Sequence, residues 1–366
     1  MRRRSMPPAP RSFHPMWRFW RLIVVSTLAL CAWLHIERRA KRMDNSHTGD
    51  MKSGRVFKKS LGQYFVKADG RTVACSISSK LRKRLIYPVA DPSSIRPHVV
   101  SVKDIRTVDP IAVGDIVSFL DAGDGSGLIT EVQHRETKLS RRAAGRKLRE
   151  QVIVVNIDQV VPVFSVARPK PKWRLLDRYL TDAEAAEVPV LICMTKMDLA
   201  KGEEVEEELS VYEDIGYPVV RTSAVTGLGL EEAKEALKGR VSVFLGKSGV
   251  GKTTLLNAIQ PGLDLRVKEV SEATRKGKHT TSHLEMFELD FGGSVVDTPG
   301  MRELGLWNID DEHMANLFRE MRPYIGQCRF GLDCSHTHEP GCAVKEAVKT
   351  GDIAERRYES YVRMRR

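Results

Sequence analysis

The sequence predicts a multi-domain α/β protein with a small β-barrel, a doubly wound parallel sheet and a short helical domain, in that order. Three observations support this prediction. Short runs of β-forming residues fill residues 54–132, apolar strands alternate with helices between residues 151 and 259, and three cysteines gather near the end of the chain. Strands that alternate with helices are typical of a parallel sheet covered on both faces. The length of 366 residues is enough for two or three domains.

The composition is that of a globular protein with a local excess of positive charge. Hydrophobic residues make up 42% of the chain, which supports ordinary cores and excludes wholesale disorder. The net charge is +12, but residues 1–50 alone hold ten Arg and Lys against three Asp and Glu. A nucleic-acid contact must therefore be argued from local patches. Six cysteines in a chain of this length are too few for a disulfide scaffold.

Residues 1–50 form a basic and apolar extension with three interpretations. The uninterrupted apolar run, residues 22–34, is thirteen residues long, whereas a membrane span needs about twenty. The extension is an organelle-targeting or signal-like segment within residues 1–42, a membrane anchor, or upstream sequence if translation begins at Met43 or Met51. We favour the third interpretation and do not expect a membrane protein.

Residues 51–150 are predicted to form the barrel. The expected strands are residues 55–57, 63–67, 72–77, 115–120 and 127–132. Asp69 and Gly70 supply a hairpin turn between the second and third strands. Five short strands suit a small Greek-key barrel of the oligonucleotide-binding (OB) type.

Two basic stretches accompany the barrel. One is residues 80–84. The other consists of Arg135, Lys138, Arg141, Arg142, Arg146, Lys147 and Arg149. We expect both at loops or at the domain exit, where they would contact the phosphates of RNA; the alternative is a solvated charged surface. Neither stretch has interleaved aromatic residues, so no base preference is predicted.

Residues 151–307 are predicted to form the doubly wound domain. Residues 151–160 have the continuous apolar character of a buried parallel strand. Further strands are expected at residues 188–194, 217–220 and 241–245, and helices at residues 173–186, 203–215 and 230–237.

A phosphate-binding loop follows the strand at residues 241–245. The pattern G-x-x-x-x-G-K-[ST] is complete between strand and helix, the context that the motif requires. Its residues are Gly246, Lys247, Ser248, Gly249, Val250, Gly251, Lys252 and Thr253, with Thr254 opening the helix. Glycines let backbone N–H groups converge on phosphate oxygens. We expect Lys252 to reach the β- and γ-phosphates and the Thr253 hydroxyl to hold Mg²⁺.

Three further motifs predict that the nucleotide is GTP. Asp198, in Thr195-Lys196-Met197-Asp198, follows an apolar strand and can accept the N1–H and 2-amino protons of guanine. Ser223 and Ala224 follow the next strand and can offer a backbone N–H to guanine O6. Asp297 is expected to hold Mg²⁺ through water, and the Gly300 N–H to sense the γ-phosphate. Thr195 replaces the Asn common in N-K-x-D, so weaker nucleotide affinity is expected.

The loop at residues 275–283 lies where a γ-phosphate-dependent switch is needed. Thr281, or else Thr280, is the expected switch ligand of Mg²⁺. Met301 stands where many GTPases have a water-orienting Gln, so slow intrinsic hydrolysis that depends on a partner is expected. His279 is our candidate for polarising the attacking water, with His283 as the alternative.

The guanine-reading motif precedes the phosphate loop, so the domain is circularly permuted. This order, residues 277–281 and the terminal Cys/His cluster resemble the ribosome small-subunit-dependent GTPase A family from about residue 54 to the C-terminus. The resemblance implies an OB barrel, a permuted GTPase domain and a C-terminal zinc domain. It also implies a cytoplasmic GTP hydrolase that binds rRNA in late small-subunit maturation and is stimulated by that subunit. We expect a monomer. The alternative is a GTP-controlled RNA-binding switch with incidental hydrolysis.

Residues 308–366 are predicted to form a helical zinc-binding domain. Three cysteines and one histidine can hold one structural Zn²⁺ tetrahedrally, and the resemblance favours His336 over His338. The expected ligands are Cys328, Cys334, His336 and Cys342. The first gap is one residue longer than the family pattern, and free thiols or a disulfide are the alternative. Helices are expected near residues 311–321 and over residues 352–366.

Overall fold

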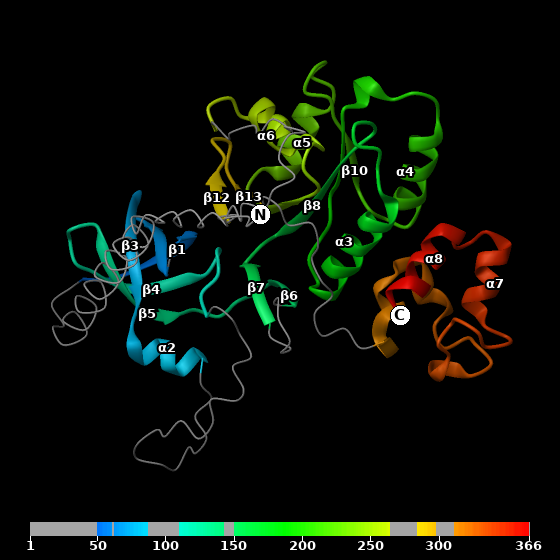
Figure 1. Ribbon diagram of the computed structural model, residues 1–366, viewed down its shortest axis with the longest axis horizontal. Helices are drawn as coiled ribbons and strands as arrows, with labels where there is room; N and C mark the ends of the chain where they lie inside the picture. The colour runs from blue at the N-terminus through cyan, green and yellow to red at the C-terminus, as the bar shows by residue number, and fades with distance from the viewer. Residues whose placement is uncertain are drawn as a thin grey trace, which may run out of the picture. The chain divides into compact units, whose positions relative to one another are not determined.

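The computed structural model describes residues 50–60, 62–86, 110–142, 150–263, 284–297 and 311–365. The extension with its apolar run at residues 22–34 therefore lies outside the described residues. Within these ranges no helix combines the length and the apolar character that a bilayer crossing requires. Figure 1 shows the barrel, the α/β domain and the C-terminal lobe, so the predicted fold class is confirmed.

Five strands close into the barrel. They are β1 (Asp50–Ser60), β2 (Gln63–Ala68), β3 (Arg71–Ile77), β4 (Ile116–Asp121) and β5 (Ser126–Val132). The strand order β1-β2-β3-β5-β4 is completed by an antiparallel pairing of β1 with β4. Asp69 and Gly70 both have positive φ at the β2–β3 turn, as a two-residue hairpin of this type needs.

The first basic stretch is helical and does not form the expected loop. Helix α2 (Ser79–Ile86) contains all of residues 80–84. The Ser78 hydroxyl accepts the Leu81 N–H at 3.1 Å, which satisfies a free donor of the first turn. Leu81 is buried in the barrel core and fixes the helix on the barrel.

Residues 151–160 form two strands and not the single buried strand that we expected. Strand β7 (Glu150–Val155) pairs antiparallel with β6 (Lys138–Arg142), and β8 (Gln159–Ser165) begins after a break. The break lies at Asn156, whose φ is +52°. Its amide donates to the Gly114 carbonyl at 3.0 Å and accepts the Glu136 N–H at 2.9 Å. These contacts stabilise a left-handed turn that a continuous strand cannot contain.

The α/β domain has a six-stranded sheet in the order β10-β9-β8-β11-β13-β12. The new strands are β9 (Ile192–Thr195), β10 (Val219–Arg221), β11 (Val241–Leu245), β12 (Glu285–Glu288) and β13 (Ser294–Asp297). The helices are α3 (Trp173–Ala185), α4 (Glu204–Asp214), α5 (Leu230–Leu237) and α6 (Lys252–Ile259). All neighbouring pairs are parallel except β12–β13.

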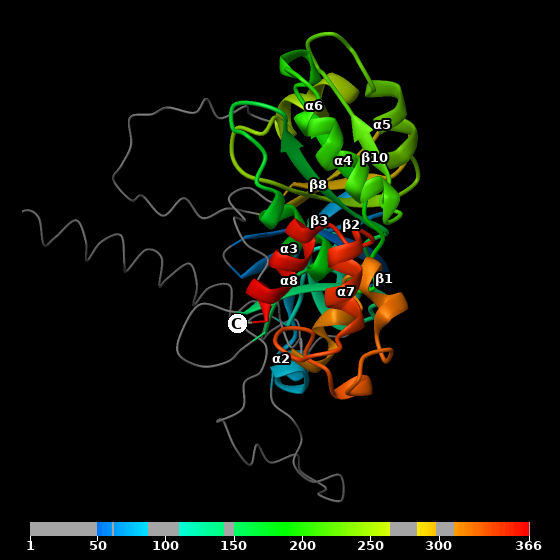
Figure 2. The same cartoon turned by 90° about the vertical axis from the view of Figure 1, so that its right-hand side faces the viewer.

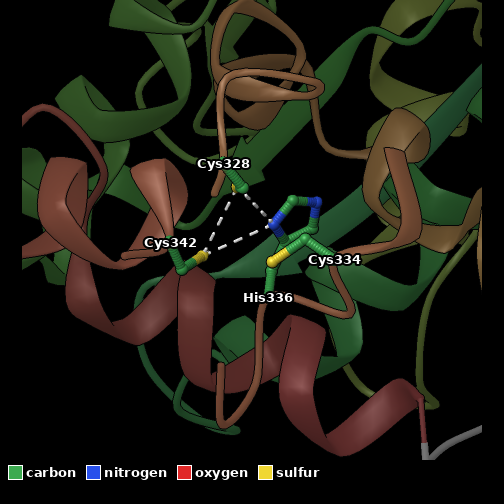
Figure 3. A group of neighbouring side chains, drawn as sticks. All are labelled: Cys328, Cys334, His336 and Cys342. Carbon is green, nitrogen blue, oxygen red and sulfur yellow. Dashed lines mark hydrogen bonds between the residues drawn. The ribbon is translucent and has the colours of Figure 1, made fainter. Parts of the chain in front are cut away.

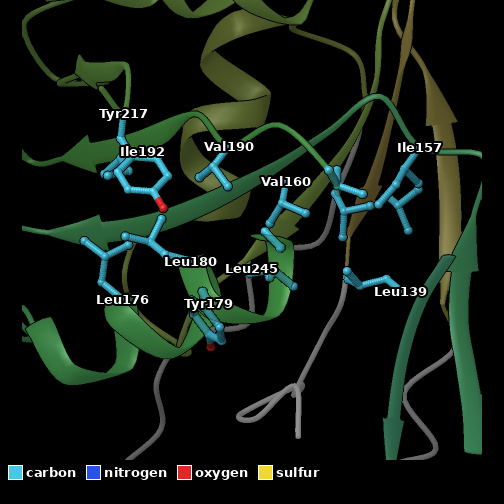
Figure 4. Close-up of a cluster of buried hydrophobic side chains, with 14 of the residues drawn as sticks. Leu139, Ile157, Val160, Leu176, Tyr179, Leu180, Val190, Ile192, Tyr217 and Leu245 are labelled. Atoms are coloured by element: carbon cyan, nitrogen blue, oxygen red, sulfur yellow. The ribbon is translucent and has the colours of Figure 1, made fainter. Parts of the chain in front are cut away.

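Two apolar cores confirm that the sheet is doubly wound. One core joins the sheet to α3 and α4 and includes Leu176, Tyr179 and Leu180 (Figure 4). The other joins the opposite face to α5 and α6. Strand β1 of the barrel also pairs with β12 through Lys58 and Glu285, so the barrel and the sheet are continuous.

The C-terminal lobe is built from short helices. They are the 3₁₀ segments η2 (Asp311–Leu317), η3 (Arg319–Tyr324) and η4 (Gly331–Asp333), followed by α7 (Ala343–Thr350) and α8 (Glu355–Met364). The single helix expected near residues 311–321 is wrong, because Phe318 is extended between η2 and η3 and its ring packs on Tyr361. Helix α8 lies against α3 (Figure 2).

Candidate functional site

The phosphate loop joins β11 to α6 and has a backbone that requires glycine. Gly246, Gly249 and Gly251 all have positive φ. A Cβ on Gly246 would lie 2.4 Å from the Val163 carbonyl oxygen, so no other residue fits there. Lys252 is the first residue of α6, and its ammonium donates to the Gly246 carbonyl at 2.7 Å. Burial lowers the pKa of Lys252, while the Asp297 carboxylate favours its charged form.

The last residue of β9, Thr195, and the residue that follows it, Lys196, hold the phosphate loop. The buried Thr195 hydroxyl lies 2.5 Å from the Val250 carbonyl and 3.1 Å from the Phe164 carbonyl. The Lys196 ammonium donates to the Gly249 carbonyl at 2.7 Å and to the Arg168 carbonyl. The threonine that replaces the common Asn therefore contacts the phosphate loop directly.

The two guanine-reading segments meet through one hydrogen bond. The Ser223 hydroxyl, which is buried, donates to an Asp198 carboxylate oxygen at 2.5 Å. The Ser223 oxygen also accepts the Val225 and Thr226 N–H groups, which shapes the loop that contains Ala224. Asp198 follows β9 in the short η1 segment (Met197–Leu199) and is exposed.

Asp198 also lines a cavity of about 850 Å³ on the side of α3 and α4. The cavity wall combines acidic, basic and apolar side chains. It consists of Val166, Ala167, Arg168, Lys170, Pro171, Trp173, Asp198, Leu199, Ala200, Lys201, Glu204, Val205, Glu207 and Glu208. The volume is in the range of small-molecule sites.

The expected Mg²⁺ ligands are only partly described. Thr253 follows Lys252 in α6, and Asp297 ends β13 in register with Phe244 of β11. Both therefore lie at the carboxyl edge of the sheet, where the phosphate loop begins. His279, Thr280, Thr281, His283, Gly300 and Met301 lie outside the described residues.

Four buried side chains in the C-terminal lobe form a group that fits zinc (Figure 3). Their ligand atoms lie within 4.8 Å of one another, and the residues are Cys328, Cys334, His336 and Cys342. The Cys328 and Cys342 sulfurs are 3.8 Å apart, and His336 Nδ1 lies 3.4 and 3.5 Å from them. Tetrahedral zinc with ordinary bond lengths sets sulfurs about 3.8 Å apart and sulfur and nitrogen about 3.5 Å apart. All three cysteines are free thiols, so the disulfide alternative is wrong.

The second basic stretch is partly engaged within the protein. Arg135 forms a two-pronged ion pair with Asp115, whose side chain has no exposure, at 2.7 Å for both bonds. Lys138 pairs with Glu150 at 2.7 Å, and Arg141 donates to Gln151 at 3.0 Å. Arg146, Lys147 and Arg149 lie outside the described residues. Arg135 is thus committed to the barrel.

The sequence analysis missed a buried polar group between α3 and the C-terminal lobe. Asp177 of α3 is completely buried and accepts hydrogen bonds from Tyr212, Arg356, Arg357 and Ser360. The available signal was an aspartate adjoining the apolar face of α3, next to Leu176. Its partners could not be identified from sequence because they lie up to 183 positions away.

Comparisons with known proteins identify the family of this chain. Residues 132–307 match the family model described as RsgA GTPase. A protein of Gemmatimonas aurantiaca named "Small ribosomal subunit biogenesis GTPase RsgA" is 46% identical over 257 residues, which cover 70% of this chain and 83% of the relative. A relative of the same name from Alkaliphilus metalliredigens is 37% identical over 316 residues, which cover 86% and 97% of the two chains.

Two solved structures extend the likeness to the whole fold. The crystal structure of YjeQ from Thermotoga maritima has a TM-score of 0.65 and 34% identity, and the alignment covers 86% of this chain and 98% of that one. YloQ, described as a circularly permuted GTPase, has a TM-score of 0.60 and 30% identity, with 87% and 96% covered.

Proposed function

This chain belongs to the RsgA family of circularly permuted GTPases, and from that membership we propose how its residues use GTP during biogenesis of the small ribosomal subunit. It is a GTP hydrolase. The observation that carries the proposal is the meeting of the guanine-reading segments, the phosphate loop and Asp297 at one edge of the sheet, in permuted order.

The phosphate loop and the β9 and β10 loops would bind GTP together. Backbone N–H groups of residues 246–254 and the Lys252 ammonium would hold the phosphates. Asp198 would accept the guanine N1–H and 2-amino protons, with its carboxylate oriented by Ser223. The exposure of Asp198 fits this role, because the base itself would cover the carboxylate. Thr195 and Lys196 would keep the loop and the base site in register.

Hydrolysis would depend on the γ-phosphate switch. Thr253, Thr281 and Asp297 would hold Mg²⁺, which supplies charge neutralisation at the β- and γ-phosphates. His279 is proposed to polarise the attacking water, because Met301 has no group that can orient it. The missing assistance would come from the small ribosomal subunit.

The remaining lobes would attach the enzyme to its partner. One structural Zn²⁺ would be held by Cys328, Cys334, His336 Nδ1 and Cys342, and four protein ligands leave no position for catalysis. The barrel and its basic stretches would contact rRNA phosphates, with Arg135 now excluded. We propose a monomeric cytoplasmic protein.

Asp198→Asn tests the nucleotide assignment. The asparagine amide cannot accept both guanine donors as the carboxylate does, whereas its N–H group can donate to the 2-oxo group of xanthine. We expect the preference for GTP over XTP to fall by about tenfold or more, measured by competition for a fluorescent nucleotide. Lys252→Ala, which should weaken both nucleotides alike, is the control. An undiminished preference for GTP in Asp198→Asn would refute the assignment.

A further inference from the structure

Helix α4 supports both segments that read guanine. It begins six residues after Asp198 in the sequence. Arg221, the last residue of β10, donates to Glu206 at 2.8 Å and to both oxygens of Glu213 at 2.8 and 2.9 Å. Ser223, two residues later, holds Asp198. A displacement of α4 would therefore move both the segment that contains Asp198 and the segment that contains Ser223.

Helix α8 of the C-terminal lobe contacts the same helix through Arg356. The Arg356 Nε lies 2.7 Å from a carboxylate oxygen of Glu208 on α4. Its guanidinium also stacks on Tyr212 of α4 and on Trp173 of α3, with centroid distances of 5.2 and 5.7 Å. Glu208 and Trp173 both line the cavity that Asp198 borders. Arg356 thus contacts two residues that line the same cavity as the guanine-reading carboxylate.

The anchor of α8 is a buried group of hydrogen-bonded side chains centred on Asp177. Asp177 accepts the Tyr212 hydroxyl at 2.8 Å, Arg357 at 2.8 Å and Arg356 at 3.1 Å. Arg357 is 1% exposed and also pairs with Glu320 at 2.7 Å. Burial raises the pKa of Tyr212, so the phenol keeps the proton that it donates. Buried charges joined in this way cannot separate without a large cost, which fixes α8 relative to α3 and α4.

Helix α8 is also tied to the loop that contains the zinc ligand His336. The Tyr358 hydroxyl donates to the His336 carbonyl at 2.8 Å, and the Tyr361 hydroxyl donates to the Ser335 carbonyl at 2.7 Å. A continuous path of contacts therefore runs from the metal-ligand loop through α8 to α4. Coupling along this path would appear as a change in nucleotide affinity when a contact on it is removed.

We propose that Arg356 is a positioning residue for guanine-nucleotide binding, through which the C-terminal lobe sets the affinity of the site by holding α4 and Trp173 in place. The inference rests on the proposed guanine site at Asp198. Arg356 acts on the base side of the nucleotide, because among the described residues its contacts are with Glu208, Trp173, Tyr212 and Asp177, none of which belongs to the phosphate loop. Its loss should therefore change Kd and KM and leave kcat unchanged.

The test uses the full chain with GDP as the probe. Arg356→Met keeps the apolar stem and removes the donors. We expect the Kd for GDP to rise by about fivefold to tenfold, in the usual range of coupling between sites, with kcat at saturating GTP unchanged. Glu208→Gln should produce part of the same rise, and the double variant should fall short of the product of the two effects. Glu359→Gln, which removes the exposed α3–α8 ion pair with Arg174, is the matched control and should bind GDP normally.

A reciprocal measurement separates positioning from mere stabilisation. If Arg356 couples α8 to the nucleotide site, GDP binding must in turn stabilise α8. We therefore expect GDP to slow amide hydrogen exchange in α8 of the native protein, and we expect no such slowing in Arg356→Met. A lower Tm with unchanged Kd in both Arg356→Met and Glu208→Gln would overturn the proposal. So would an equal rise in Kd for Glu359→Gln. If Arg356→Met does not fold, Glu208→Gln with native Kd gives the same negative answer. If Asp198→Asn keeps the native preference for GTP over XTP, the assignment of the guanine site to Asp198 is wrong, which is a separate outcome from the failure of the Arg356 proposal.

Discussion

The Thr195 hydroxyl links the guanine-reading strand to the phosphate loop with a single proton. It is buried and lies within hydrogen-bond distance of the carbonyls of Val250 and Phe164. Loss of the hydroxyl would leave two buried acceptors without this donor, and a buried group without its partner costs more than the bond itself contributes. Thr195 therefore stabilises the nucleotide site although it is not one of the residues proposed to contact the base.

Thr195→Val should lower the affinity for GDP and GTP equally. We expect a loss of about tenfold, since one such hydrogen bond is worth about 1.5 kcal/mol. Thr195→Ser, which keeps the hydroxyl, is the control and should stay near the native affinity. Fluorescent-nucleotide titration measures both. Native affinity in the valine variant would show that the contact to the loop has no part in binding.

Individual site residues differed in how far sequence could predict them. Lys252 and Asp198 could be named because phosphate and guanine chemistry demand those residue types at those places. The positions of their partners could not. The contact of Thr195 with Val250 spans 55 residues, and the ion pair of Arg135 with Asp115 spans 20. Such pairings depend on which loops the fold brings together, and no local pattern records them.

At the scale of elements, the ion pair between Arg135 and Asp115 fixes the end of the barrel. Asp115 also accepts the Ala112 N–H at 2.7 Å, and Arg135 donates to the Pro110 carbonyl at 2.9 Å. The segment that enters β4 and the segment that leaves β5 are thereby joined. Arg135 therefore stabilises the barrel, although in the sequence it belongs to a basic stretch.

Arg135→Ala should destabilise the barrel by about 3 kcal/mol, because it leaves a buried carboxylate without its cation. Chemical denaturation followed by circular dichroism measures the loss. Lys138→Ala breaks the more exposed pair with Glu150 and should cost less than about 1 kcal/mol. Equal stability of the two variants would contradict an internal role for Arg135.

Element types were predicted well where apolar periodicity was long, and poorly where a single residue broke it. The helix at α3 and the strand at β11 follow their apolar patterns closely. Asn156 splits an apolar run because its amide stabilises a left-handed turn, and Phe318 interrupts a helical pattern because its ring is needed against Tyr361. In both places tertiary contacts outweigh local propensity.

At the scale of the whole molecule, the C-terminal lobe depends on its metal site. The three cysteines belong to the hydrophobic core of this small lobe, and His336 is buried beside them. Because a structural metal supplies folding free energy, removal of zinc by a chelator should speed amide exchange in α7 and α8 by about tenfold or more. Cys328→Ser should do the same without a chelator. Unchanged exchange in both helices would contradict a structural zinc, and exchange in β1–β5 serves as the internal control.

The chain is a GTP hydrolase, and we propose that the small ribosomal subunit stimulates it. The most direct test is the GTP hydrolysis rate at a fixed protein concentration, with and without purified small subunits, beside Lys252→Ala. We expect stimulation of about a hundredfold, the effect of supplying one missing transition-state contact, and its loss in Lys252→Ala. GTP-dependent binding of the subunit without any stimulation would contradict the claim and favour a GTP-controlled RNA-binding switch.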